Sequence, residues 1–98
     1  MKFPISKYKV YGSSMNPTLK EGQEVITFNW GKPKVGDMVV IKKDGIEMVK
    51  RIQMSSDPLR EASRGTFVQG DNKKESTDSR HFGPVDKSQI VGKVVKWY

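Results

Sequence analysis

The sequence predicts an all-β domain, either a barrel or a sandwich, and two features of its composition support this fold class. Val, Ile and Thr make up 21 of the 98 residues, whereas Leu occurs twice and Ala once. β-Branched side chains suit a pleated, half-buried surface, while Leu and Ala are the usual residues of helices. Nine Gly and five Pro interrupt the apolar runs at short intervals, which is typical of short strands joined by turns.

Six strands are expected where apolar and β-branched residues gather between these interruptions, at residues 7–11, 23–29, 37–43, 46–53, 66–69 and 89–97. The segment Lys43-Asp44-Gly45 predicts a tight hairpin between the third and fourth strands, because Asp-Gly tolerates positive φ. Segments 54–65 and 71–81 are polar and rich in turn residues, so we expect them to be surface loops.

One short helical turn is expected at residues 16–21. Asn16 would cap it, Pro17 would occupy its first helical position and Gly22 would end it. A chain of 98 residues has room for one domain, and no internal repeat or change of composition divides it. We therefore expect a single domain over residues 1–98.

The composition excludes several kinds of chemistry. Cysteine is absent, so disulfides and thiolate nucleophiles are excluded, and the single histidine gives too few ligands for an ordinary zinc site. We expect neither a metal nor an organic cofactor. The longest apolar run, 38–41, is far shorter than the ~20 residues of a membrane span, and residues 1–7 lack the apolar stretch of a secretion signal. We expect a soluble, cytoplasmic monomer in which peripheral membrane contact stays open, or a membrane-associated protein if a longer chain carries an anchor.

Lys50 is placed unusually for a charged residue. Side chains of a strand alternate between its two faces, and Lys50 lies on an apolar face that it shares with Ile46, Met48 and Ile52. Burial of an ammonium group lowers its pKa, and a neutral lysine can act as a general base near neutral pH. The alternative is that the stem packs on the core while the charged head reaches water.

Ser14 is a candidate nucleophile for this base. A strand is expected to end at Gly12, which permits unusual backbone angles, and Pro17 rigidifies the segment that follows. Backbone N–H groups in such a turn can stabilise a developing oxyanion. The alternative is that the polar side chains of this segment only cap and turn the chain.

Four segments, taken in order along the chain, resemble the motifs of the type I signal peptidase family. The nucleophile motif of that family, Gly-x-Ser-Met-x-Pro-Thr-Leu, is matched by Gly12-Ser13-Ser14-Met15-Asn16-Pro17-Thr18-Leu19. Its Gly-Asp strand resembles residues 35–40, and its general-base motif resembles Val49-Lys50-Arg51-Ile52. Its last motif, Gly-Asp-Asn followed by Ser-x-Asp-Ser-Arg-x-Phe-Gly, resembles residues 70–85. Each motif is weak alone, but the four together are highly specific.

The resemblance implies a fold and a set of roles. The fold is a small, partly open β-barrel of the type shared by signal peptidases and LexA-like peptidases, with one short helical turn. Ser14 corresponds to the nucleophile, with its backbone N–H in the oxyanion hole, and Lys50 corresponds to the general base. Ser76 corresponds to the serine that orients the base, while Asp78 and Arg80 correspond to a pair that braces the site. Candidates for the lining of the substrate groove are Gly12, Met15 and Pro17.

The chain also departs from the family pattern. Signal peptidases usually carry N-terminal membrane anchors, and from this sequence we expect none. The large inserted cap of many relatives is reduced here to the nineteen residues between Lys50 and Gly70. Gly12 stands where some relatives add a hydroxyl to the oxyanion hole. The chain is similar in size to the short maturation proteases found beside nickel-type superoxide dismutases.

These observations predict a serine endopeptidase that works through a Ser–Lys dyad and an acyl-enzyme. The resemblance implies cleavage of a signal peptide or propeptide after small residues. We expect the substrate to bind as an extended strand along an exposed sheet edge, without metal.

Two other functions are open. A LexA-like self-cleaving peptidase shares the dyad and the fold, but only thirteen residues precede Ser14, and such repressors have a DNA-binding domain and a cleavage segment there. A basic β-barrel that binds nucleic acid would suit the net charge of +7, although the lysines are dispersed rather than gathered in one run. Aromatic residues that could stack on bases are Tyr8, Tyr11, Phe28, Trp30, Trp97 and Tyr98.

Overall fold

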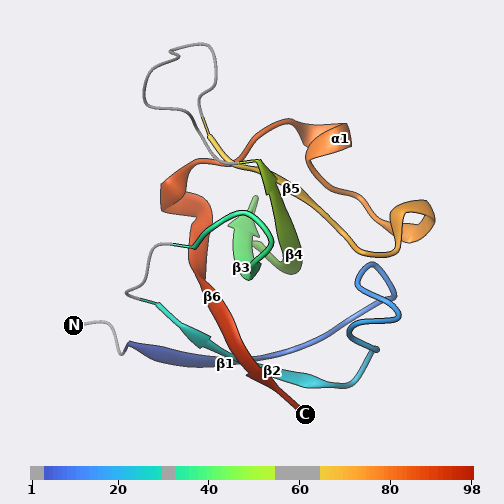
Figure 1. Cartoon of the computed structure of the whole chain (residues 1–98), viewed down its shortest axis with the longest axis vertical. Coiled ribbons are helices and arrows are strands. Elements are labelled where there is room, and N and C mark those ends of the chain that lie inside the picture. The colour runs from blue at the N-terminus through green and yellow to red at the C-terminus, as the bar shows by residue number, and fades with distance from the viewer. Residues whose placement is uncertain (1–3, 30–32, 55–64) are drawn as a thin grey trace.

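The computed structural model describes residues 4–29, 33–54 and 65–98 (Figure 1). The six strands are β1 (Ile5–Lys9), β2 (Glu24–Phe28), β3 (Met38–Lys43), β4 (Ile46–Met54), β5 (Phe67–Gln69) and β6 (Ile90–Trp97). The short helices are η1 (Lys73–Glu75), α1 (Ser79–Phe82) and η2 (Lys87–Gln89). The predicted all-β class is confirmed, and each strand lies within two residues of its predicted bounds.

The six strands form one antiparallel sheet in the order β1-β2-β6-β3-β4-β5. Strands β1 and β5 are its two edges, so the sheet is not closed, which agrees with a partly open barrel. The predicted hairpin joins β3 to β4, and its turn residues Asp44 and Gly45 have φ of 53° and 79°. Both angles fall in the region that Asp-Gly tolerates.

The sheet bends at register shifts in three of its strand pairs. One lies between Ile26 and Thr27 where β2 pairs with β6, and another lies between Val40 and Ile41 where β3 pairs with β6. A third interrupts the pairing of β4 with β5. A bulge of this kind bends the strand and increases its local twist. The sheet therefore curls, and β1 comes to face the first half of β4.

The apolar core packs against both faces of β3, the most deeply buried strand. One cluster consists of Val10, Met15, Leu19, Val25, Met38, Val40 and Val94. The other consists of Val39, Ile41, Ile52, Val68 and Val85. Because successive residues of a strand point to opposite faces, β3 contributes alternately to the two clusters. Its partner β4 likewise contributes to both clusters, with Val49 packed against the first and Ile52 in the second.

The loops differ from the prediction in two places. The helical turn expected at 16–21 is instead a hydrogen-bonded turn over residues 14–18, in which the Leu19 amide donates to the Met15 carbonyl at 2.9 Å. The chain then turns back instead of continuing as a helix. The Gly22 amide donates a hydrogen bond to the Val10 carbonyl at 2.9 Å. The segment expected as a loop at 71–81 contains η1 and most of α1. The predicted loop 54–65 lies almost entirely outside the described residues.

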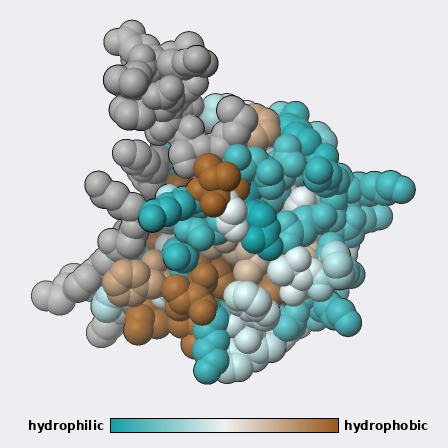
Figure 2. Space-filling model, in the orientation of Figure 1, coloured by the Kyte–Doolittle hydropathy of each residue, from teal (hydrophilic) through white to brown (hydrophobic). Residues whose placement is uncertain are grey.

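Apolar surface gathers where β1 begins and β2 ends, at the lower left of Figure 2. Ile5 and Phe28 are cross-strand partners there, and both are exposed. Most of the right-hand side of the same view is hydrophilic. Within the described part of the chain, none of the helices has the length and apolar character needed to cross a membrane.

Candidate active site

Lys50 is buried, as its place in the strand predicts. It belongs to β4, pairs with Val39 of β3 and is only 3% exposed. Its Nζ atom does not reach water as the alternative expected but donates a hydrogen bond to Ser76 Oγ at 3.0 Å. Burial lowers the pKa of Lys50; the negative charge of Asp78 opposes this shift, and Arg80 adds to it.

Asp78 anchors the serine that Lys50 contacts. The Ser76 hydroxyl donates to Asp78 Oδ2 at 2.8 Å, and the Gly70 amide donates to the same oxygen at 2.9 Å. Arg80 donates from Nε to Oδ1 at 2.9 Å and from Nη2 to Oδ2 at 3.0 Å. The residues expected from the resemblance to support the base therefore meet in one network.

The Asp78 carboxylate is fully buried and accepts these hydrogen bonds in the charged form. Burial by itself would raise the pKa of Asp78, but the hydrogen bonds from Arg80, the Gly70 amide and Ser76 outweigh it and hold the pKa well below its ordinary value. Asp78 also caps α1, because its side chain accepts from the Arg80 amide. A fixed negative charge therefore lies one hydroxyl group away from Lys50 Nζ.

Ser14 lies in the turn that follows β1, on the other side of the same network. Gly12, at the start of this turn, has a φ of +78°, which glycine adopts without strain. The Ser14 carbonyl accepts from the Asn72 amide at 2.8 Å, and the Asn72 side chain donates to the Ser13 carbonyl at 3.0 Å. Neither the hydroxyl nor the amide of Ser14 has a hydrogen-bond partner among the described residues. Both groups are available to a ligand.

An ion pair fixes the segment that holds Ser14. Arg51 donates from Nε and Nη2 to the two carboxylate oxygens of Asp71, at 2.9 and 2.8 Å, and from Nη1 to the Gly36 carbonyl at 2.7 Å. The Asp71 amide in turn donates to Met15 Sδ at 3.4 Å. Sequence reasoning missed this role of Arg51. Alternation placed its side chain on the face opposite Lys50, but nothing in the sequence indicated a partner twenty residues away.

Gly70 joins the two halves of the site. A Cβ atom at this position would clash with the Ser76 side chain and with the Ser14 carbonyl oxygen. The backbone of Gly70 therefore fills the space between the turn of Ser14 and the hydroxyl that Lys50 contacts. Among the described contacts no hydrogen bond joins Ser14 Oγ directly to Lys50 Nζ, and this close packing is what relates the two residues.

Replacing Gly70 with alanine is expected to lower the free energy of unfolding by about 1–3 kcal/mol, because the added methyl group overpacks a site whose nearest neighbours include backbone. Relief of the clash requires either Ser76 to move, which breaks its hydrogen bond with Lys50, or the Ser14 turn to move away from Gly70. Urea unfolding followed by tryptophan fluorescence measures the loss. An unchanged urea midpoint would mean that the space beside Gly70 is not filled as described.

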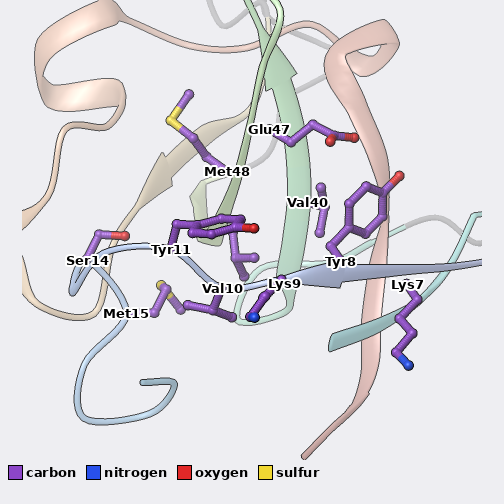
Figure 3. A pocket seen from close by; sticks show the side chains of 11 residues that line it. Lys7, Tyr8, Lys9, Val10, Tyr11, Ser14, Met15, Val40, Glu47 and Met48 are labelled. Carbon is purple, nitrogen blue, oxygen red and sulfur yellow. The ribbon is translucent and has the colours of Figure 1, made fainter. Parts of the chain in front are cut away.

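A pocket of about 460 Å³ opens beside Ser14 (Figure 3). Strand β1 and the residues that follow it form one wall, and the first half of β4 forms the other. Apolar residues of its lining include Val10, Met15 and Val49. Of the predicted groove residues, Met15 lies in this lining, whereas Gly12 and Pro17 lie outside it.

Comparisons with known proteins agree with these motifs. The family described as signal peptidase, peptidase S26, matches residues 1–54 and 62–98. The mitochondrial ATP-independent inner membrane protease subunit 1a of Arabidopsis thaliana is 38% identical over 118 residues, which cover 96% of this chain and 70% of the relative. Signal peptidase IB of Staphylococcus aureus is 30% identical over 149 residues, which cover 95% of this chain and 77% of the relative.

The fold and these similarities define the chain as a serine-type endopeptidase. It belongs to the signal peptidase family S26. Serine protease activity on signal peptides follows at the level of the family.

Proposed function

We propose that the chain cleaves an extended segment of a protein, such as a signal peptide or propeptide, through a dyad of Ser14 and Lys50. The observation that carries this proposal is the buried, hydrogen-bonded Lys50, whose pKa is lowered by burial. A lysine in this state can hold a neutral amine close to neutral pH, as a general base requires. The unpartnered hydroxyl of Ser14 beside the pocket supplies a matching nucleophile.

In the proposed mechanism, neutral Lys50 accepts the proton of Ser14 Oγ as the oxygen attacks the scissile carbonyl carbon. The Ser14 amide donates to the oxyanion that forms. Protonated Lys50 then gives this proton to the leaving amine, which departs and leaves an acyl-enzyme. Neutral Lys50 next accepts a proton from the water that attacks the ester and returns it to Ser14 Oγ as the acid product leaves. Ser76 and Asp78 orient the Lys50 amine, and the negative charge of Asp78 stabilises the lysine while it carries the proton.

The substrate would lie as a strand in the pocket between β1 and β4. Strand β1 is an edge of the sheet, and β4 pairs with β5 only from Arg51 onward, so both walls offer unpaired backbone. An extended peptide can hydrogen-bond to such edges. The apolar side chains beside Ser14 suit the small residues that would precede the cleaved bond.

The direct test uses peptides with a fluorescent donor and quencher on either side of an Ala-rich cleavage sequence. Ser14→Ala is expected to lower kcat/KM by at least about a thousandfold, since loss of a nucleophile removes the whole covalent route. Ser13→Ala is the matched control, because the exposed Ser13 hydroxyl has no hydrogen bond among the described residues, and it is expected to stay within about twofold of the parent protein. Equal turnover by the parent protein and Ser14→Ala would overturn the proposal.

Cytoplasmic location, a monomeric state, peripheral membrane contact and independence of metal remain predictions from the sequence. Turnover measured after dialysis against a chelator is the simplest check of the independence of metal. The Ser–Lys mechanism requires that the activity persist unchanged.

A further inference from the structure

One end of the pocket, remote from Ser14, contains a carboxylate that the proposed mechanism does not use. Glu47 of β4 lies there, with Tyr8 of β1 nearby on the opposite wall (Figure 3). In the register of the hairpin, Val49 pairs with Val40 and Glu47 pairs with Lys42. Residues two apart share a face, so Glu47 projects to the same side of β4 as the apolar pocket residue Val49.

The side chain of Glu47 has no hydrogen bond or ion pair with any other residue that the structure describes. Lys42, its cross-strand partner, is the nearest candidate by register but does not come within ion-pair distance. Lys7 also lines the pocket, but its Nζ atom binds Glu24 at 3.0 Å. Lys9 also lines the pocket; it lies opposite Glu24 in the register of β1 and β2 and forms no ion pair among the described residues.

Tyr8 faces the pocket on the wall opposite Glu47. Alternation along β1 places the Tyr8 side chain with Val10 on the inner face, whereas the exposed Lys7 and Lys9 border the pocket from the outer face of the strand. The half-buried ring of Tyr8 and the exposed carboxylate of Glu47 therefore border the same space. An aromatic face and a carboxylate together suit the stem and the charged head of a lysine or arginine.

The spacing along β4 indicates which substrate residue would reach Glu47. Glu47 and Lys50 are three residues apart, or about 10 Å along a strand. A peptide lying beside β4 with its cleaved bond at Lys50 would present its third or fourth residue to Glu47. The pocket extends from Ser14 in this direction, so it can hold a substrate residue at this distance from the cleaved bond.

We propose that Glu47, together with the ring of Tyr8, selects substrates with a lysine or arginine at the third or fourth position from the cleaved bond. This inference rests on the proposed function, because it assumes that the substrate strand occupies the pocket beside Ser14. It makes Glu47 a specificity-determining residue for a basic side chain, in addition to the small residue at the cleaved bond.

The test compares pairs of peptides that differ at a single position. At the third or the fourth position, one peptide of each pair carries lysine and the other carries the uncharged analogue norleucine. For the parent protein at low salt, kcat/KM is expected to be about fivefold higher for the lysine peptide, a ratio in the range of a partly exposed ion pair with an aromatic contact. The preference is expected to shrink at high salt. Glu47→Gln is expected to abolish it, and Glu47→Lys is expected to reverse it.

Asp86→Asn is the matched control, because it makes the same change of net charge at an exposed position outside the pocket lining. It is expected to keep the preference of the parent protein. A ratio that is the same in the parent protein and Glu47→Gln, or that Asp86→Asn changes equally, would overturn the inference.

A second measurement separates this inference from the proposed catalytic role. Binding of fluorescein-labelled lysine and norleucine peptides to Ser14→Ala, followed by fluorescence anisotropy, needs no cleavage. Tighter binding of the lysine peptide to Ser14→Ala than to the double variant Ser14→Ala/Glu47→Gln supports the selectivity, whatever the catalytic mechanism. Equal binding to both variants refutes the selectivity and leaves the Ser–Lys mechanism to be judged by the cleavage assay.

Discussion

Replacement of Lys50 with methionine is expected to abolish cleavage and, at the same time, to stabilise the fold. Loss of a general base costs about a hundredfold to ten-thousandfold in rate. Methionine fills nearly the same volume without a buried amine, and replacement of a buried charged group by an apolar one often raises stability by about 1–4 kcal/mol. Ser76 keeps its bond to Asp78 in this variant, because the hydroxyl donates to the carboxylate independently of Lys50.

The stability gain of Lys50→Met has a definite pH dependence. The pKa of Lys50 is lower in the folded protein than in the unfolded chain. Between these two pKa values the unfolded chain carries a proton on Lys50 and the folded protein does not. The parent protein is therefore destabilised progressively as the pH falls toward the folded pKa. The difference between Lys50→Met and the parent protein is expected to be smallest at strongly alkaline pH and to become constant below the folded pKa.

Thermal unfolding at several pH values measures this difference, and at this chain length 1 kcal/mol corresponds to about 4–8 °C in Tm. Lys34→Met serves as the control, since Lys34 is exposed and distant in sequence from the site.

In the parent protein kcat/KM is expected to rise with pH, with a midpoint below the ordinary pKa of lysine, because only neutral Lys50 is active. An active Lys50→Met protein, or one that is less stable than the parent at neutral pH, would contradict the account of Lys50 as a buried base.

The features that depend on local pattern were predictable from the sequence. The strands follow from runs of β-branched residues, and the hairpin at Asp44-Gly45 follows from the turn preference of that pair. The burial of Lys50 follows from alternation along a strand, although Ile46, on the same predicted face, is 61% exposed because it lies at the start of the hairpin strand. Alternation gives the face of a strand but not how far the core extends along it.

The features that depend on distant parts of the chain were not predictable in the same way. The bond between Arg51 and Asp71 and the contact of Gly70 with the Ser14 turn join segments far apart in sequence. The pocket exists only because bulges curl the sheet until β1 faces β4. Helix α1 was missed because its capping box uses His81 in place of the usual Glu or Gln.

Replacement of Asp78 with asparagine is expected to cost about 3–5 kcal/mol of stability, the penalty for breaking a buried pair at one partner. Both oxygens of Asp78 accept from donors: Oδ2 accepts from Ser76 and Gly70, and Oδ1 accepts from the Arg80 amide and side chain. Asparagine must turn its NH₂ group toward one of these sets. Whichever orientation it takes, donors meet donors inside the protein.

The loss in Asp78→Asn is also expected to depend on pH. The pKa of Asp78 lies well below its ordinary value in the folded protein, so its contribution is complete above the ordinary carboxyl range and declines as the pH falls toward the folded pKa. The urea midpoints of the parent protein and Asp78→Asn are therefore expected to differ most near neutral pH and to converge in acid. Asp86→Asn, which removes an exposed carboxylate outside this network, controls for the change of net charge.

Asp78→Asn should also reduce cleavage more than its loss of stability explains. Without the carboxylate, the Ser76 hydroxyl loses the acceptor that fixes its direction, and the Lys50 amine loses both its orienting partner and the charge that stabilises its protonated form. The rise of kcat/KM is therefore expected to shift to lower pH in Asp78→Asn, because loss of a neighbouring negative charge lowers the pKa of an amine further. A pH profile that stays in place in a folded Asp78→Asn protein would show that Asp78 holds the fold together but does not act on Lys50.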